Sequence, residues 1–80
     1  MDKKTIIDEI KNKVTTYSSW QIGITDDLQR RKGEHDNPEH WRSWIADSED
    51  DARSIEKYFL DKGMKGDIGG GISPNKVYIF

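Results

Sequence analysis

A glutamate lies on the apolar stripe of the helix predicted over residues 49–62. In a helical projection Ala52, Ile55, Phe59 and Leu60 define an apolar arc, and Glu56 falls inside it. Burying an unpaired carboxylate costs several kcal/mol, so Glu56 should meet an arginine, a metal ion or water in a cleft. The alternative is that Glu56 lies at the edge of the arc and pairs with Arg53 or Lys57.

An arginine and a histidine share one face of a second predicted helix. Leu28, Arg31 and His35 are spaced i, i+3 and i+7, which places them on one stripe. A purely structural helix would usually carry more apolar residues there, so the stripe indicates a polar site. The alternative is a solvated basic helix that is anchored by Leu28 alone.

The segment before this helix predicts how the helix is positioned. Trp20, Ile22 and Ile24 alternate with less apolar residues, which is typical of a half-buried strand. The sequence Thr25-Asp26-Asp27 then supplies an N-cap and an acidic first turn. We therefore expect a strand that turns into a helix near Thr25.

The remaining elements follow from similar patterns. An amphipathic helix is predicted over residues 2–14, a strand over 41–46 with Trp44 or Ile45 inward, a helix from its Ser48 cap to Lys62, and a strand over 76–80. A glycine-rich loop and a turn at 73–75 precede the last strand. We predict one α+β domain with a small, mostly antiparallel three-stranded sheet flanked by helices.

Length and composition limit the classes of function. A chain of 80 residues forms one domain with a small core. It has no cysteine and no apolar run long enough to span a membrane, so we expect a cytoplasmic protein. The formal net charge of −2 argues against tight non-specific binding to DNA.

The segment over residues 20–35 resembles the second half of the GIY-YIG nuclease signature. That signature has a Tyr-Ile-Gly strand followed by a helix with an arginine and then a histidine or tyrosine. Here the strand contains Gln21-Ile22-Gly23, and Arg31 and His35 follow. Downstream, Ala52-Arg53-Ser54-Ile55-Glu56 resembles the family's Ala-x-x-x-Glu, and Asn75 is the position that matches its later asparagine.

The resemblance covers roughly residues 20 to 75 and implies a metal-dependent DNA endonuclease. Residues 1–19 would be an N-terminal helix and connection, 20–75 the core that bears the motif, and 76–80 a C-terminal strand. In this interpretation Glu56 binds Mg²⁺ or Mn²⁺, Arg31 neutralises charge on the phosphate, and His35 or a tyrosine assists proton transfer. The remaining expected substrate-binding residues are Gly23, Arg30, Lys32 and Asn75.

The chain departs from the family at its tyrosines. Gln21 occupies the second tyrosine position, and no first motif strand precedes Trp20. We hypothesise that the strand 76–80 takes the place of the missing one and brings Tyr78 to the site. Tyr17 is a second candidate, although it lies only six residues before Gly23, and Tyr78 could instead be a core residue.

Other interpretations remain open from the sequence. The chain could be a catalytically inactive nucleic-acid- or protein-binding module of the same fold, since it lacks the motif tyrosines. Glu34, His35, Glu39 and His40 could instead bind a metal such as Zn²⁺. The chain could be a monomer or a weak dimer.

Overall fold

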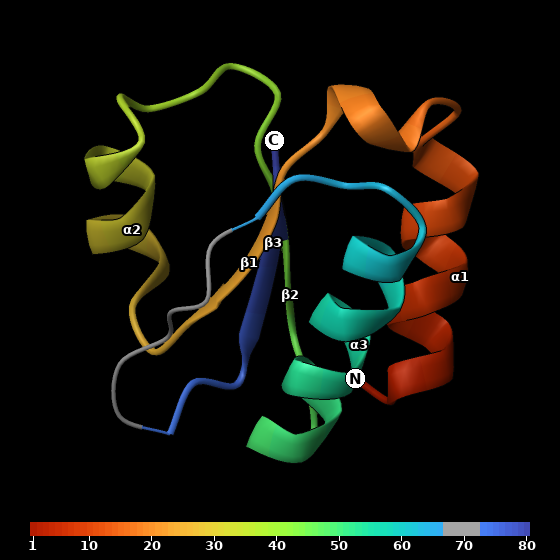
Figure 1. The fold of residues 1–80 in the computed structure, drawn as a ribbon. Coiled ribbons are helices and arrows are strands. Elements are labelled where there is room, and N and C mark those ends of the chain that lie inside the picture. The colour runs from red at the N-terminus through yellow and green to blue at the C-terminus, as the bar shows by residue number, and fades with distance from the viewer. Residues whose placement is uncertain (67–72) are drawn as a thin grey trace.

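The fold is a three-stranded antiparallel sheet with helices on both sides (Figure 1). The computed structural model describes residues 1–66 and 73–80, so most of the glycine-rich loop lies outside the described residues. The elements in chain order are α1 Lys3–Lys13, the 3-10 helix η1 Tyr17–Ser19, β1 Ile22–Thr25, α2 Leu28–Glu34, β2 Arg42–Ile45, α3 Glu49–Asp61 and β3 Lys76–Ile79. The predicted α+β class is confirmed.

The last strand of the chain is the central strand of the sheet. The strand order is β1-β3-β2, and β3 is antiparallel to both neighbours. Tyr78 on β3 is paired with Gly23 on β1 and with Ser43 on β2. Residues 76–80 are therefore the strand that joins the two other strands into one sheet.

One face of the sheet carries the hydrophobic core. Figure 1 shows α1 and α3 on this side. The fully buried apolar side chains come from α1, α3 and alternate strand positions: Ile6, Ile10, Ile22, Ile55, Phe59, Val77 and Ile79. This face is the largest apolar surface that folding removes from water, so it supplies most of the stabilisation.

The other face of the sheet points toward α2, which lies on the opposite side in Figure 1. Successive strand side chains alternate between faces, so Gly23 and Tyr78 face α2 while their neighbours Ile22 and Ile79 face the core. The helix α2 itself buries no residue fully. The sheet therefore separates an apolar face from a face with polar groups.

Local sequence explains where the helices begin and end. The side chains of Asp2, Asp27 and Ser48 accept hydrogen bonds from backbone N–H groups in the first turns of α1, α2 and α3. After α3, Gly63 adopts a φ of 112°, which favours glycine and ends the helix. The observed ends of α1 and α3 agree with the predicted boundaries. The helix α2 begins at Leu28, later than the predicted change near Thr25, and it has no acidic residue in its first turn because Asp27 is the cap and Asp26 precedes it.

Two uncertain features of the second strand are settled. Trp44 is 7% exposed and packs in the core, whereas Ile45 is 54% exposed. The strand β2 spans Arg42–Ile45, slightly shorter than the predicted range. A one-residue change of register would reverse both side chains, so the inward position of Trp44 fixes the register.

None of the helices in the described part of the chain is long and apolar enough to cross a membrane. The cytoplasmic location expected from the sequence stays a prediction.

Candidate functional site

Three polar side chains meet between α2 and the sheet. The Arg31 Nε–H donates a hydrogen bond to the Tyr78 hydroxyl oxygen at 3.0 Å. The same hydroxyl lies 3.3 Å from His35 Nε2, and the direction of that hydrogen bond depends on the imidazole tautomer. We call Arg31, His35 and Tyr78 the Arg-Tyr-His cluster.

The helix α2 places two members of the cluster on one face. Arg31 lies inside α2 and His35 is its C-terminal cap residue. The chain then turns through Asp36 and Asn37, which have φ values of 63° and 50°. Aspartate and asparagine tolerate this left-handed conformation better than most residues. The turn ends the helix after His35, so the imidazole stays beside the sheet.

Arg31 has a second partner on its own helix. Its Nη1 donates to Glu34 Oε1 at 3.1 Å, and its side chain is 25% exposed. The hydrogen bond to Tyr78, and then the one to Glu34, raises the pKa of Arg31. The guanidinium therefore stays charged and is held over the Tyr78 hydroxyl.

Gly23 provides the space that Tyr78 occupies. A Cβ atom at position 23 would clash with the hydroxyl end of the Tyr78 ring. Tyr78 is only 3% exposed, because its ring crosses the neighbouring strand at this glycine. Glycine is thus required here by close approach of a side chain from the paired strand.

Two further aromatic residues complete the surroundings of the cluster. The Trp41 ring stacks on Tyr78 with centroids 4.6 Å apart and planes 11° apart, and the Phe80 ring lies 4.7 Å from His35. Sequence analysis missed both residues. Because side chains alternate along a strand, Phe80 could have been placed on the same face of the sheet as Tyr78 from the sequence. The position of Trp41 depends on how β2 pairs with β3, which the sequence does not show.

The second tyrosine candidate lies elsewhere. Tyr17 belongs to η1, and its ring packs 5.9 Å from Phe59 in the apolar core. Of the two tyrosines proposed for the site, Tyr78 is the one that contacts Arg31 and His35.

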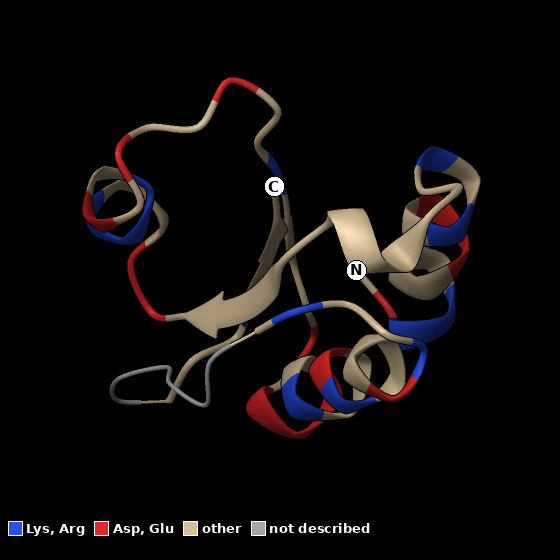
Figure 2. Cartoon of the chain, turned by 45° about the horizontal axis from the view of Figure 1, so that its top comes forward, with Lys and Arg blue, Asp and Glu red and all other residues tan. Residues whose placement is uncertain are grey.

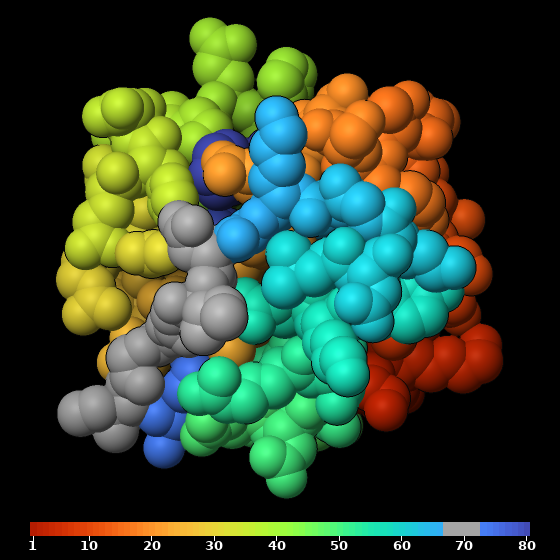
Figure 3. Space-filling view, in the orientation of Figure 1, coloured from red at the N-terminus to blue at the C-terminus, as the bar shows by residue number. Residues whose placement is uncertain are grey.

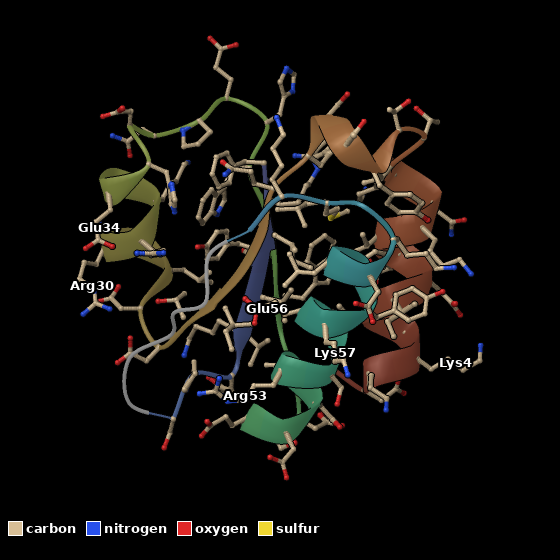
Figure 4. All side chains as sticks on the ribbon, in the orientation of Figure 1. Lys4, Arg30, Glu34, Arg53, Glu56 and Lys57 are labelled. Carbon is tan, nitrogen blue, oxygen red and sulfur yellow. The ribbon has the colours of Figure 1, made fainter. Side chains whose placement is uncertain are left out.

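The expected substrate-binding residues occupy different places. Arg30 is exposed and pairs with Asp26 at 3.0 Å, and Figure 4 shows it on the outer side of α2. Lys32 is partly buried on α2. The Asn75 side chain accepts a hydrogen bond from Lys76 at the opposite end of β3 from Phe80. Gly23 lies against the Tyr78 ring, and the Lys32 carbonyl accepts a hydrogen bond from the His35 backbone N–H at 3.2 Å.

Glu56 is buried, as its place on the apolar arc indicated. It is 7% exposed, and its Oε2 has no hydrogen-bond partner among the described residues. Burial raises its pKa, an effect that Arg53 partly opposes. In Figure 4 Glu56 extends from α3 toward the sheet, and α3 packs on the face opposite α2. The described contacts therefore join Arg31, His35 and Tyr78 without Glu56.

Residues 1–66 and 73–80 do not assemble a recognisable cation site. They contain no group of three or more histidine, cysteine, aspartate or glutamate side chains placed to hold a metal ion. Mg²⁺ requires an oxygen-rich octahedral environment, and Glu56 alone in an apolar layer does not fit it. The proposed Zn²⁺ set of Glu34, His35, Glu39 and His40 is not gathered either.

The charges of the chain are mixed over the surface. Figure 2 shows that Lys or Arg residues and Asp or Glu residues both occur along α1, α2 and α3. Several of them form ion pairs along one helix, such as Lys4 with Asp8 and Arg53 with Glu49. Such exposed pairs contribute little to stability, and they leave no continuous basic stripe in this view.

Comparisons of the chain with protein-family models, with curated proteins and with solved structures find no match. The resemblance to GIY-YIG nucleases therefore depends on the residues of this chain and on their arrangement.

Proposed function

We propose that the chain is a GIY-YIG-like domain that binds and hydrolyses a nucleic-acid phosphodiester, DNA being the expected substrate. The contact between Tyr78 and both Arg31 and His35 is the observation that carries this proposal. It joins a fixed positive charge, a hydroxyl and a titratable imidazole at one point, and phosphoryl transfer depends on charge neutralisation and proton transfer.

The cluster suggests a role for each side chain. In the tautomer with an unprotonated Nε2, His35 can accept the Tyr78 hydroxyl proton, while Arg31 stabilises the phenolate that remains. The phenolate can then take a proton from a water that attacks phosphorus. The ester P–O bond opposite the water breaks with its electron pair on the leaving sugar oxygen, which takes a proton from solvent, and His35 returns its own proton to solvent. Arg31 also has further N–H groups to direct at the phosphate oxygens.

The strand order supports the hypothesis that the C-terminal strand, which carries Tyr78, takes the place of the missing first motif strand. The C-terminal strand β3 is antiparallel to β1 and directly beside it, where a hairpin would place a preceding motif strand. The segment 76–80 can therefore take the place of the missing first strand, although it follows the other motif residues in the chain.

Dependence on Mg²⁺ or Mn²⁺ stays a prediction of the family resemblance. Glu56 is its expected ligand, and among residues 1–66 and 73–80 no group of three or more acidic or histidine side chains is placed to complete such a site. The roles given above use only this chain's own side chains.

The second candidate is a binding module of the same fold that does not hydrolyse its ligand. Tyr78 is 3% exposed beneath the stacked ring of Trp41, so water and phosphate reach the hydroxyl only if these rings move. The net charge of −2 and the glutamine at position 21 also favour this candidate. Both candidates use Arg31 to hold a phosphate.

A cleavage assay on labelled single-stranded and duplex DNA, with and without Mg²⁺ or Mn²⁺, tests the proposal. Tyr78→Phe removes the hydroxyl and keeps the ring, so we expect cleavage to fall by about 100-fold or more, the scale of general acid-base catalysis. Binding should remain, because the Arg31 charge is intact. If the wild type binds DNA but does not cleave it, the chain is the binding module.

Arg30→Ala is the matched control for Arg31→Ala. The two arginines are adjacent on α2, but Arg30 pairs with Asp26 and does not contact Tyr78. Arg31→Ala should weaken DNA binding and Arg30→Ala should not. Equal effects of both variants would show a general charge effect and contradict a site at the Arg-Tyr-His cluster.

A further inference from the structure

An open pocket lies at the end of the sheet beside the Arg-Tyr-His cluster. Its volume is about 250 Å³, and it is lined by Ser19, Trp20, His40 and Phe80. These residues come from the segment before β1, the segment before β2 and the end of β3. On the face drawn in Figure 3, the dark-blue end of β3 shows only a small area between the orange and yellow-green segments.

Phe80 connects this pocket to the cluster. Its backbone N–H and carbonyl exchange hydrogen bonds with Gln21 at 3.1 and 2.8 Å, which fixes it at the end of the central strand. Its ring lies 4.7 Å from the His35 ring and 5.7 Å from the Trp41 ring. A ligand in the pocket would therefore be one aromatic ring away from the imidazole of His35.

The lining of the pocket is suited to a flat aromatic ligand. An indole, a phenyl ring and an imidazole supply planar walls, and Ser19 supplies a hydroxyl that can donate or accept a hydrogen bond. Unstacked nucleobases in protein complexes stack on these kinds of side chain.

Two positively charged residues, Lys65 and Arg42, neighbour the segments that line the pocket. Lys65 lies alongside the Trp20 backbone, since its N–H donates to the Trp20 carbonyl at 3.0 Å. Arg42 follows Trp41, and its Nη1 approaches the Trp41 carbonyl at 3.5 Å. Both side chains are exposed and form no ion pair with the described residues. Sugar-phosphate groups on either side of a bound base would meet these charges.

We propose that the pocket binds one unpaired nucleobase of the nucleic acid whose phosphodiester lies at Arg31. This inference rests on the proposed function and narrows its substrate to a strand with an unstacked base near the scissile bond. The base stacks between Trp20 and Phe80, and the adjoining phosphate is directed toward α2. Single-stranded DNA is accordingly preferred to a fully paired duplex.

The flanking charges favour a nucleobase over a cationic ligand. Aromatic pockets also bind quaternary ammonium groups through cation-π attraction. Here the neighbouring residues Lys65 and Arg42 carry positive charges, and repulsion among like charges opposes a cation. An anionic strand with a neutral base fits both the rings and the charges around them.

Binding of a thymidine hexamer, compared with the same hexamer containing one central abasic site, tests the proposal. Followed by NMR of the labelled protein, the intact strand should shift the Trp20 indole and His40 ring signals. The loss of one stacked base should weaken binding by about 5- to 100-fold. His40→Ala changes an exposed residue. It should weaken binding of the intact strand and have little effect on binding of the abasic strand.

Tyr58→Ala is the matched control, because Tyr58 is a partly exposed aromatic residue on α3 that packs on Phe59 away from the pocket. It should leave both affinities unchanged. Trp20 packs partly against the core, so Trp20→Phe is chosen over Trp20→Ala because it keeps a ring there. It should bind the intact strand with intermediate affinity. Equal binding of intact and abasic strands, or no shift at Trp20 and His40, overturns the pocket proposal.

Free thymidine and tetramethylammonium separate the remaining outcomes. Thymidine has no phosphate, so shifts at Trp20 and His40 on its addition support the base pocket whether or not the cluster cleaves DNA. Unchanged cleavage in Tyr78→Phe together with such shifts means that the proposed function fails and the pocket stands. Stronger shifts with tetramethylammonium than with thymidine overturn the nucleobase assignment.

Discussion

The two faces of the sheet are filled by different means. On the α1 and α3 side, aliphatic residues and Phe59 are fully buried and need only shape and volume to pack. On the α2 side, Tyr78 is equally well buried, but it is held by hydrogen bonds to Arg31 and His35 and by a stacked tryptophan. The helix α2 buries no residue fully.

This difference separates stability from binding. The apolar face depends on removing side chains from water, and the Glu56 carboxylate is buried there at a cost. The α2 face leaves Arg31, His35, Trp41 and Phe80 partly exposed around one buried hydroxyl. A domain with a small core can therefore keep polar groups on one face because the other face supplies most of the stabilisation.

The largest expected contrast is between an aromatic residue removed from each face. Phe59→Ala should lower the free energy of unfolding by about 3–5 kcal/mol, because it leaves a cavity in the fully buried core. Trp41→Ala should cost only about 1–2 kcal/mol, since Trp41 is partly exposed. Urea titration followed by circular dichroism measures both. Equal losses would mean that the two faces contribute alike to stability.

Two glycines test how tightly Tyr78 is packed. Gly23→Ala should destabilise the fold by about 1–3 kcal/mol, because the added methyl group meets the Tyr78 ring. Gly33→Ala on α2 should stabilise by about 1 kcal/mol, since its Cβ meets nothing within 4 Å and alanine favours a helix. Thermal unfolding of both variants gives the comparison. Stabilisation by Gly23→Ala would contradict the close approach of Tyr78.

The buried carboxylate on the apolar face should make stability depend on pH. Burial raises the folded-state pKa of Glu56, so the folded state binds its proton more tightly than the unfolded chain does. The destabilising effect of the ionised Glu56 carboxylate is therefore absent below the usual glutamate pKa. It develops as the pH rises through the raised pKa of the folded state. Glu56→Gln should remove this dependence on pH. Near neutral pH the free energy of unfolding of the variant should exceed that of the wild type by about 1–2 kcal/mol.

Unfolding of the wild type and of Glu56→Gln at several pH values between 4 and 8 measures the effect. Glu49→Gln is the control, because Glu49 lies at the start of α3 and pairs with Arg53 nearer the surface. A stability difference between wild type and Glu56→Gln that stays constant with pH would contradict a raised pKa. If Mg²⁺ stabilises the wild type but not Glu56→Gln, Glu56 is a metal ligand despite its surroundings.

The smallest expected effect concerns the hydroxyl of Tyr78. Tyr78→Phe removes hydrogen bonds to Arg31 and His35 while keeping the stacked ring. We expect a loss of about 0.5–1.5 kcal/mol in stability, smaller than the Phe59→Ala loss, together with the large loss of cleavage described above. A variant that loses stability without losing cleavage would make the hydroxyl structural.

The sequence alone predicted the main helices and strands and placed Glu56 on the apolar arc, because these depend on local periodicity and capping; the burial of Glu56 was decided by the structure. Asp27 and Ser48 cap their helices through side chains a few residues from the groups that they bind. The spacing of Arg31 and His35 likewise placed both on one helix face. Each of these features is encoded within about one turn of chain.

Only the tertiary structure decided which of these residues meet. Tyr78 is 47 positions from Arg31 and 43 from His35, and their contact depends on β3 entering the centre of the sheet between β1 and β2. The same pairing sets Tyr78 against Gly23 and brings Phe80 to Trp41. Strand order and the choice of face follow from packing of the whole chain, so local patterns do not reveal that Glu56 and Arg31 extend from helices on opposite sides of the sheet.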